Sequence, residues 1–302
     1  MEFDRRPSTV AYMLRALVPS PGLDAGRPPP DIRAAWRRNR IDRAHLASFL
    51  RLTGLGAGAT VPLLYPQVLG FPLLMAVLTS RAFPLGIWGS LQIRNHLLQR
   101  RPIAVDEVLD LEAAVVARRV LEKGVEFDLH TAAIAQGEIA WESLNTFYYR
   151  GRFGPPVDPS PLARAPEVHG GEVARWRIPG GGGWEFGGLT GDYNGLHWSR
   201  WWARRFGFRA DFLHPPRVLG MCLARLTPPP AGGPERLDAW LKGPVHYGAE
   251  ASLREVAEAG GGLFALHADG DARPAVVGRW TRSNLDEWPP ILYGVPSRRA
   301  RG

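Results

Sequence analysis

The stretch Pro66-Gln67-Val68-Leu69-Gly70-Phe71 recurs further along the chain as Pro216-Arg217-Val218-Leu219-Gly220-Met221. An apolar run that fits a helix follows each copy. Beyond each helix the chain reaches a basic residue and a proline, at Arg101-Pro102 in the first copy and at Lys242-Gly243-Pro244 in the second. Because these features keep the same order, the sequence predicts two diverged copies of one structural unit.

Strand-like stretches with turn residues between them come after the helix in both copies. They cover residues 109–120, 125–135 and 138–149 in the first copy and 249–256, 263–268 and 274–281 in the second. A helix followed by an antiparallel meander gives an α+β unit in which the sheet wraps around the helix. The proline-rich segment 151–167 is predicted to be a linker, so the predicted domains are residues 1–150 and 168–302.

The second copy is preceded by Gly191-Asp192-Tyr193-Asn194-Gly195-Leu196-His197, in which a carboxylate and an imidazole lie five positions apart. Asp accepts a proton, neutral His accepts or donates one, and a turn lets both reach a single water molecule. The same residues also fit a solvated loop with a capping Asp. At the corresponding place the first copy has residues 53–60, with neither carboxylate nor imidazole, so the first copy is predicted not to catalyse.

Residues 189–198, together with Phe206-Gly207-Phe208 and residues 216–221, resemble the MaoC-like R-specific enoyl-thioester hydratases and 3-hydroxyacyl-thioester dehydratases of the hot-dog fold. Residues 65–76 resemble the N-terminal half of the double hot-dog members. The resemblance implies a double hot-dog fold with a non-catalytic first domain and a catalytic second domain. Gly195 stands where the family has Pro, which should loosen the turn, and Leu219 stands where the family has a second His.

The resemblance implies reversible hydration of trans-2-enoyl thioesters to 3R-hydroxyacyl thioesters, with Asp192 and His197 holding the water. The backbone N–H of Gly220, expected in the first turn of the predicted helix, is the candidate donor to the developing enolate oxygen. Asn194 is expected to fix the loop or, alternatively, to contact the substrate. No metal or redox cofactor is implied, because the other histidines lack metal-ligand spacing. Among them, His214 lies near Gly220 and could line the pocket, but a position in a turn or at the surface is favoured.

The implied substrate is a thioester of coenzyme A or of an acyl carrier protein. Arg200, Arg204 and Arg217 follow the catalytic loop and could attract such an anionic carrier, although each equally fits a solvated helix face. Gly70 and Met75 belong to the predicted helix of the first copy. They are expected to line or support the tunnel for the acyl chain.

Length and composition fit a soluble enzyme, and the resemblance implies a place in fatty acid metabolism in the cytoplasm, with a homodimer as a compatible assembly. The net charge of +8 comes from scattered arginines without a nucleic-acid-binding motif, which argues against nucleic acid as a partner. The apolar stretch 61–79 is interrupted by Pro and Gly, so a buried helix is predicted there rather than a membrane span. The single cysteine, Cys222, cannot form an internal disulfide, as a reducing cytoplasm permits.

Two other functions remain compatible with these residues. A hot-dog acyl thioesterase would bind the same substrates but release free thiol. A non-catalytic acyl-binding or scaffold protein is disfavoured by the intact Asp192 and His197 and favoured by the Leu219 departure. Incubation with crotonyl-CoA separates hydration from thiol release.

Overall fold

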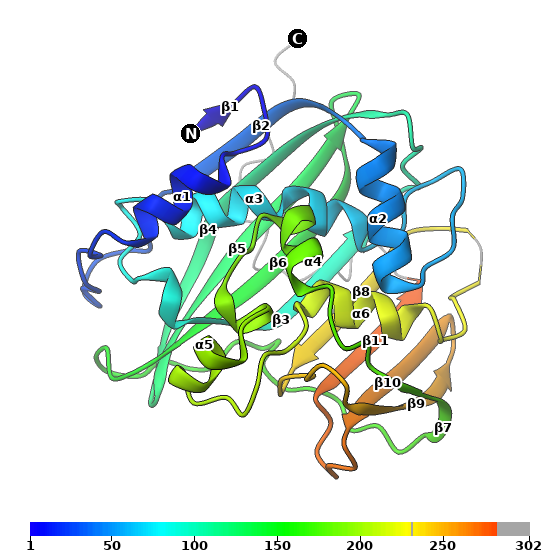
Figure 1. Cartoon of the computed structure of the whole chain (residues 1–302). Coiled ribbons are helices and arrows are strands. Elements are labelled where there is room, and N and C mark those ends of the chain that lie inside the picture. The colour runs from blue at the N-terminus through cyan, green and yellow to red at the C-terminus, as the bar shows by residue number, and fades with distance from the viewer. Residues whose placement is uncertain (231, 283–302) are drawn as a thin grey trace.

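The computed structural model describes residues 1–230 and 232–282. Within them the chain forms one mixed α+β body (Figure 1). The strands are β1 (Glu2–Phe3), β2 (Arg33–Arg40), β3 (Ser90–Gln99), β4 (Val108–Leu121), β5 (Gly124–Ala135), β6 (Glu138–Arg150), β7 (Gly171–Arg177), β8 (Glu235–Leu241), β9 (Glu250–Glu258), β10 (Gly261–Ala268) and β11 (Val276–Arg282). The helices are α1 (Thr9–Ala16), α2 (Arg43–Thr53), α3 (Tyr65–Leu78), α4 (Gly183–Thr190), α5 (Arg200–Arg205) and α6 (Pro215–Leu223), with short 3₁₀ turns η1 (Ile87–Gly89) and η2 (Gly195–His197).

The strand order shows that the chain is built from two copies of one unit. All described strands form one sheet in the order β1-β2-β4-β5-β6-β3-β8-β11-β10-β9-β7. Read outward from the centre, β3-β6-β5-β4-β2 in the first half matches β8-β11-β10-β9-β7 in the second half. The halves join through antiparallel pairing of β3 with β8. This arrangement confirms the predicted α+β fold of two repeated units.

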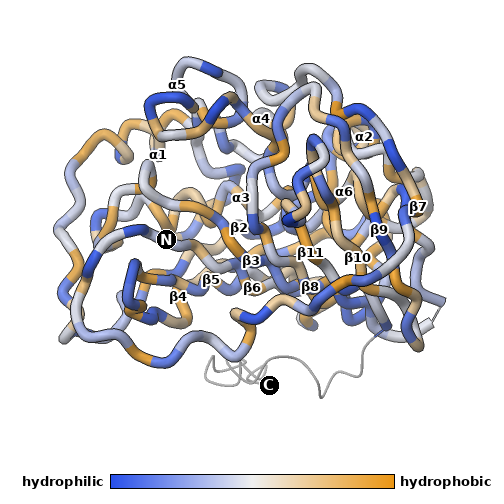
Figure 2. Tube along the Cα trace, turned by 90° about the horizontal axis from the view of Figure 1, so that it is seen from below, coloured by the Kyte–Doolittle hydropathy of each residue, from blue (hydrophilic) through white to orange (hydrophobic). Residues whose placement is uncertain are grey.

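Each half has its central helix packed on the sheet. In Figure 2 the strands form one layer, α3 and α6 lie on it, and α1, α2, α4 and α5 lie beyond these two helices. Every residue of α3 is buried, as expected for a helix that is apolar on all sides. A Cβ atom on Gly70 would lie 3.1 Å from Thr131 Cγ2, so the glycine lets α3 approach β5 closely.

The elements that were predicted agree with the observed ones. The six strand-like stretches are β4, β5, β6, β9, β10 and β11, and the predicted linker, residues 151–167, contains no helix or strand. The apolar stretch is α3, and none of the helices in the described ranges is both long and apolar enough to cross a membrane. Of the second predicted domain, residues 231 and 283–302 lie outside the described residues.

Candidate active site

The loop that carries the predicted acid and base is held by its own backbone geometry. Helix α4 ends at Gly191, whose φ of 75° is the left-handed conformation that glycine adopts without strain. The loop then turns into η2, where the Asn194 side chain accepts a hydrogen bond from the Leu196 N–H at 3.2 Å. The Asn194 side chain therefore stabilises the turn between the carboxylate and the imidazole.

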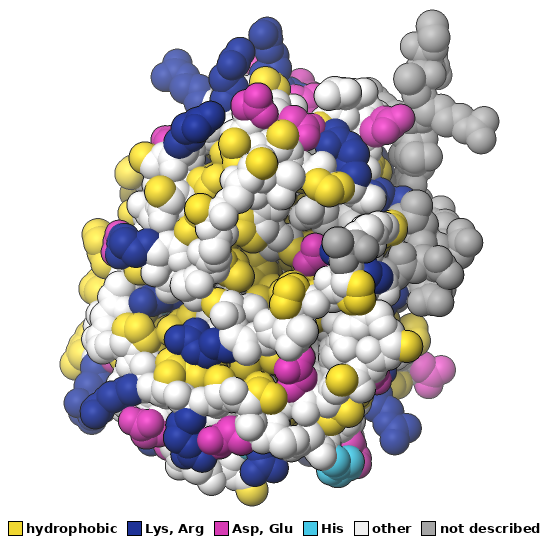
Figure 3. Space-filling model, turned by 90° about the vertical axis from the view of Figure 1, so that its right-hand side faces the viewer, with side chains coloured by type: hydrophobic (Ala, Val, Ile, Leu, Met, Phe, Trp, Pro, Cys, Tyr) yellow, Lys and Arg dark blue, Asp and Glu magenta, His cyan; other side chains and the backbone are white. Residues whose placement is uncertain are grey.

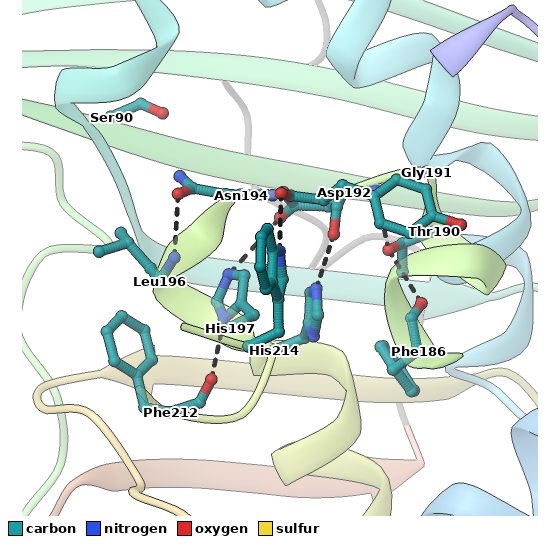
Figure 4. A network of polar contacts seen from close by, with 12 residues as sticks. Ser90, Phe186, Thr190, Gly191, Asp192, Asn194, Leu196, His197, Phe212 and His214 are labelled. Carbon is teal, nitrogen blue, oxygen red and sulfur yellow. Dashed lines mark hydrogen bonds and ion pairs between the residues drawn. The ribbon is translucent and has the colours of Figure 1, made fainter. Parts of the chain in front are cut away.

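Asp192 and His197 face each other across a short gap (Figure 4). His197 Nδ1 lies 3.0 Å from the Phe212 carbonyl, so Nδ1 carries a hydrogen that it donates, and in the neutral form of the ring the lone pair is on Nε2. The Nε2 atom is 3.6 Å from Asp192 Oδ2, while Asp192 Oδ1 accepts the Asn194 N–H at 3.0 Å. Each base is thus oriented by a separate hydrogen bond to backbone.

An open pocket of about 860 Å³, including solvent-open space, lies above this pair. Its walls are mostly apolar and come from both halves of the molecule. The first half contributes Tyr12, Met13, Ala16, Phe71, Met75, Thr79, Ile87, Trp88, Ser90, Leu91, Gln92 and Phe147, and the second half contributes residues 190–194, Leu196, His197, Phe212, His214, Pro215 and Pro216. The predicted acid and base therefore lie in a pocket shaped for an apolar ligand.

A second imidazole, His214, lies inside this site. It is 1% exposed, and its ring stacks on His197 with 3.8 Å between the ring centroids. His214 Nε2 is 2.9 Å from the Asp192 carbonyl oxygen. Burial, followed by the nearby charge of His197, holds the pKa of His214 well below its usual value. His214 therefore lines the pocket and does not lie at the surface, because it directly precedes α6, which begins next to the catalytic loop.

The same three side chains could hold a cation. The ligand atoms of Asp192, His197 and His214 all lie within 4.8 Å of one another, and two imidazoles with a carboxylate are a donor set that transition metals accept. Because His214 Nε2 already bonds to a carbonyl, its Nδ1 would have to be the ligand atom. Sequence spacing could not show this group, since His214 comes from a different element.

The predicted role of the Gly220 N–H rests on a place in the first turn of the helix, and that place is wrong. Helix α6 begins at Pro215, so Gly220 lies in the second turn, where a helical N–H bonds to the carbonyl four residues earlier. In the first turn, Pro215 and Pro216 have no N–H, and the amides of Arg217 and Val218 both donate to the His214 carbonyl. No free amide is left there for an oxyanion.

Gly220 instead serves helix packing. A Cβ atom on Gly220 would lie 2.5 Å from Thr53 Cγ2, so the glycine allows α6 to pack closely against the end of α2.

The three arginines proposed to attract a carrier are in different environments. Arg217 is 3% exposed, and its guanidinium donates to the carbonyls of Leu52 at 3.3 Å and Gly181 at 2.8 Å. It therefore ties α6 to neighbouring backbone and does not face the pocket. Arg200 and Arg204 are exposed on α5 and do not line the pocket either. On the face shown in Figure 3, basic and acidic side chains are interspersed.

The first half contributes to the pocket through a helix that the sequence did not suggest. Met75 lines the pocket, whereas Gly70 packs against Thr131 and does not. Helix α1 adds Tyr12, Met13 and Ala16 to the wall. Ser8, whose hydroxyl caps α1, is a helix-start signal, but the position of α1 over the pocket follows only from tertiary packing.

Tyr12 fastens α1 to the catalytic loop. Its buried hydroxyl donates to the Gly191 carbonyl and lies 2.8 Å from Thr9 Oγ1. Burial raises the pKa of Tyr12 to about 12, so the hydroxyl stays protonated. Arg6 adds two hydrogen bonds of 2.8 Å to the carbonyls of Gly188 and Leu189 at the end of α4.

Gly195, the first departure from the family pattern, has a packing reason. A Cβ atom at this position would lie 2.6 Å from ring atoms of Trp202. The indole therefore occupies the space that a side chain on residue 195 would need. The second departure, Leu219, is 1% exposed and belongs to the apolar core.

Comparison with known proteins agrees with this architecture. No protein-family profile matches the chain. The chain is 27% identical over 230 residues to 3-hydroxyacyl-thioester dehydratase X of Mycobacterium tuberculosis, and the match covers 76% of this chain and 78% of that protein. The crystal structure of HtdX from Mycobacterium tuberculosis matches with a TM-score of 0.69 at 26% identity, over 82% of this chain and 99% of that chain.

Two more distant structures show the same fold. A MaoC-like dehydratase from Phytophthora capsici matches with a TM-score of 0.66 at 16% identity, over 86% of this chain and 97% of its own. A conserved Mycobacterium tuberculosis protein described as a double hot-dog matches with a TM-score of 0.53 at 15% identity, over 83% of this chain and 95% of its own. The chain is therefore a double hot-dog protein whose sequence and structure are similar to those of the MaoC-like dehydratases, as its sequence motifs predict.

Proposed function

We propose that this protein catalyses the reversible hydration of trans-2-enoyl thioesters, which in the other direction is dehydration of 3R-hydroxyacyl thioesters. One observation carries the proposal: His197 Nε2 and Asp192 Oδ2 are 3.6 Å apart at an apolar pocket. That distance is too long for a good direct hydrogen bond and leaves both atoms able to bond to one water. The name of the HtdX relative, a dehydratase of 3-hydroxyacyl thioesters, supports the same reaction.

The proposed mechanism uses these two side chains as proton carriers. Water held between them attacks the β carbon of the enoyl group and gives one proton to the lone pair on His197 Nε2. The electron pair of the double bond moves toward the α carbon and the thioester oxygen. The α carbon then takes this proton back from His197 Nε2, which restores the neutral thioester and returns His197 to its starting state. Asp192 Oδ2 accepts a hydrogen bond from the other O–H of the water, which stays in the product hydroxyl, and keeps the water oxygen aimed at the substrate.

The developing negative charge on the thioester oxygen needs a donor, and Asn194 is the proposed one. Its side-chain Oδ1 is already occupied by the Leu196 N–H, so Nδ2 is the atom left to donate. Asn194 lines the pocket, and within the described ranges no protein atom accepts a hydrogen bond from this amide nitrogen. This role replaces the one expected for Gly220.

Each half of the molecule has a separate proposed role. The first domain, residues 1–150, supplies most of the apolar wall through α1, α3 and η1, so it is proposed to select the acyl chain without doing chemistry. The second domain, residues 168–302, supplies Asp192 and His197. Arg200 and Arg204 on α5 are proposed to attract the phosphates of coenzyme A or of an acyl carrier protein. A cytoplasmic place in fatty acid metabolism and a homodimeric assembly belong to this proposal as well.

Crotonyl-CoA is the substrate for the decisive test. Loss of enoyl absorbance without release of free thiol, and a mainly 3R product in chiral analysis, would support the proposal. Release of thiol would identify a thioesterase instead. Binding without turnover would identify an acyl-binding protein, and a mainly 3S product would remove the MaoC-like mechanism.

A further inference from the structure

The proposed reaction gives roles to Asp192 and His197 and leaves the neighbouring imidazole of His214 without one. His214 is the residue before helix α6 and is 1% exposed. It contacts both catalytic residues, the backbone of Asp192 and the side chain of His197. Nε2 bonds to the Asp192 carbonyl at 2.9 Å, and the ring lies nearly parallel to His197, with 25° between the planes.

We propose that His214 is a positioning residue of the active site, which fixes the backbone of Asp192 through Nε2–H and the ring plane of His197 through stacking. This inference rests on the proposed hydration reaction. The two contacts act on the two ends of the gap between His197 Nε2 and Asp192 Oδ2. Losing either contact would change that gap, and a displacement of about 1 Å in a catalytic group can cost roughly a hundredfold in rate.

The charge state of His214 suits this role. Burial is the largest influence on its pKa, and the neighbouring charges of His197 and Arg217 lower it further. His214 therefore stays neutral when His197 carries the proton removed from water. A neutral aromatic ring stacked on a cationic one avoids the repulsion that two adjacent imidazolium rings would suffer.

Stability alone does not account for an imidazole at this position. His214 Nδ1 is buried and has no hydrogen-bond partner in the described part of the chain. An unpaired buried polar atom is costly, and an apolar ring of similar size would avoid that cost. Phe186 already packs against the His214 ring, with 5.2 Å between the ring centroids, so the surroundings accommodate an aromatic side chain.

The test compares three variants of the full chain. His214→Phe keeps the ring and removes the donor. His214→Gln places an amide nitrogen as many bonds from Cβ as His Nε2, and His214→Asn places it one bond too close. We expect His214→Phe to melt within a few degrees of wild type while kcat for crotonyl-CoA falls about a hundredfold at little change in KM. His214→Gln should recover at least about tenfold, and His214→Asn should not.

Two further measurements separate positioning from mere packing. In a His197→Ala background, His214→Phe should add almost no further loss, because residues that act through one another are not additive. Hydrogen exchange of the Asn194 and Leu196 amides should speed up in His214→Phe and slow again in His214→Gln. That readout needs no activity, so a wild-type protein that does not hydrate crotonyl-CoA would remove the proposed function without removing the positioning role.

The inference is overturned if His214→Phe keeps near-wild-type kcat, if only KM changes, or if Gln and Asn behave alike. It is also overturned if the Asn194 and Leu196 amides exchange at the wild-type rate in His214→Phe.

Discussion

His96 of β3 and Asp238 of β8 are directly paired across the seam that joins the two halves, with His96 Nδ1 2.8 Å from Asp238 Oδ1. Each lies six residues before a proline of the repeated pattern, Pro102 or Pro244, so the two occupy equivalent positions in the two copies. Both side chains are buried, at 0% and 7% exposure. Although burial raises the pKa of Asp238, its hydrogen bond with His96 and the charge of Arg236 bring the pKa below the usual value.

This pair should stabilise the joining of the two halves. We expect Asp238→Ala to lower the free energy of unfolding by about 3 kcal/mol, because it leaves a buried imidazole without its partner. Asp238→Asn keeps an acceptor for His96 Nδ1 and should cost clearly less. Denaturant unfolding followed by circular dichroism measures both variants, and equal stability of Asp238→Ala and wild type would contradict a structural role for the pair.

The catalytic pair gives a second prediction. Asp192→Asn and His197→Ala should each lower hydration of crotonyl-CoA by at least about a hundredfold, the usual scale for loss of acid–base catalysis. Both side chains are partly or largely buried beside the pocket rather than in the apolar core, so thermal melting should confirm folded variants. Steady-state kinetics would refute the assignment if either variant retained near-wild-type turnover.

The architecture could be predicted from the sequence because it depends on the local periodicity of apolar residues and on the order of the repeated motifs. The stretch 125–135 alternates as a strand does, and β5 spans Gly124–Ala135. The all-apolar helix after Pro66 is likewise evident in the sequence, since a helix buried on all sides needs apolar residues on every face. Edge-to-edge joining of the two sheets follows from the family resemblance and not from any single residue.

The active site could be predicted only in part, because local sequence patterns do not show which distant segments pack together. Asp192 and His197 converge because one short loop carries both, so their spacing is a usable signal. His214, just before α6, and Tyr12 of α1 both contact the loop, and only tertiary packing brings these segments together. The expected position of Gly220 in the helix was wrong for a local reason: a helix that starts at Pro215 rather than later places that residue in the second turn.

Burial of neutral His214 predicts a pH dependence of stability. Its pKa is lowered in the folded state and ordinary in the unfolded state, so the unfolded chain binds the extra proton as pH falls below about 6.5. Stability is therefore full above this pH and declines below it, by up to about 2 kcal/mol at pH 5 from this group. Denaturant unfolding at pH 7 and pH 5 should show a smaller decline in His214→Gln. His45, whose burial also lowers its pKa, contributes equally to both proteins, and parallel declines would exclude the assignment to His214.

The contact between Gly195 and Trp202 predicts that substitutions at these two positions have non-additive effects on stability. Gly195→Ala should cost about 1 to 3 kcal/mol of stability, because its Cβ would lie 2.6 Å from the indole ring. In a Trp202→Ala background the same substitution has room and should cost much less. A double-mutant cycle from denaturant unfolding measures the difference. Additive effects would show that the indole does not determine the residue at position 195.

The first half should govern the range of acyl chains. Met75 lines the pocket from α3, so Met75→Phe should obstruct space away from the catalytic pair and penalise long substrates more than crotonyl thioester. The readout is kcat/KM for a long-chain enoyl thioester divided by kcat/KM for a four-carbon one. Overpacking a filled site costs about 1 to 3 kcal/mol, so this ratio should fall by at least about fivefold. Met75→Leu conserves volume and is the matched control.

Gly70→Phe separates tunnel effects from folding effects in the same experiment. Because Gly70 faces Thr131 and not the pocket, a large side chain there should lower the melting temperature and reduce activity on both substrates alike. One outcome is that Met75→Phe loses activity on long substrates selectively, with no matching fall in its melting temperature. That result would place the acyl chain against α3. An unchanged ratio in folded Met75→Phe would mean that the first half supports the sheet without selecting the substrate.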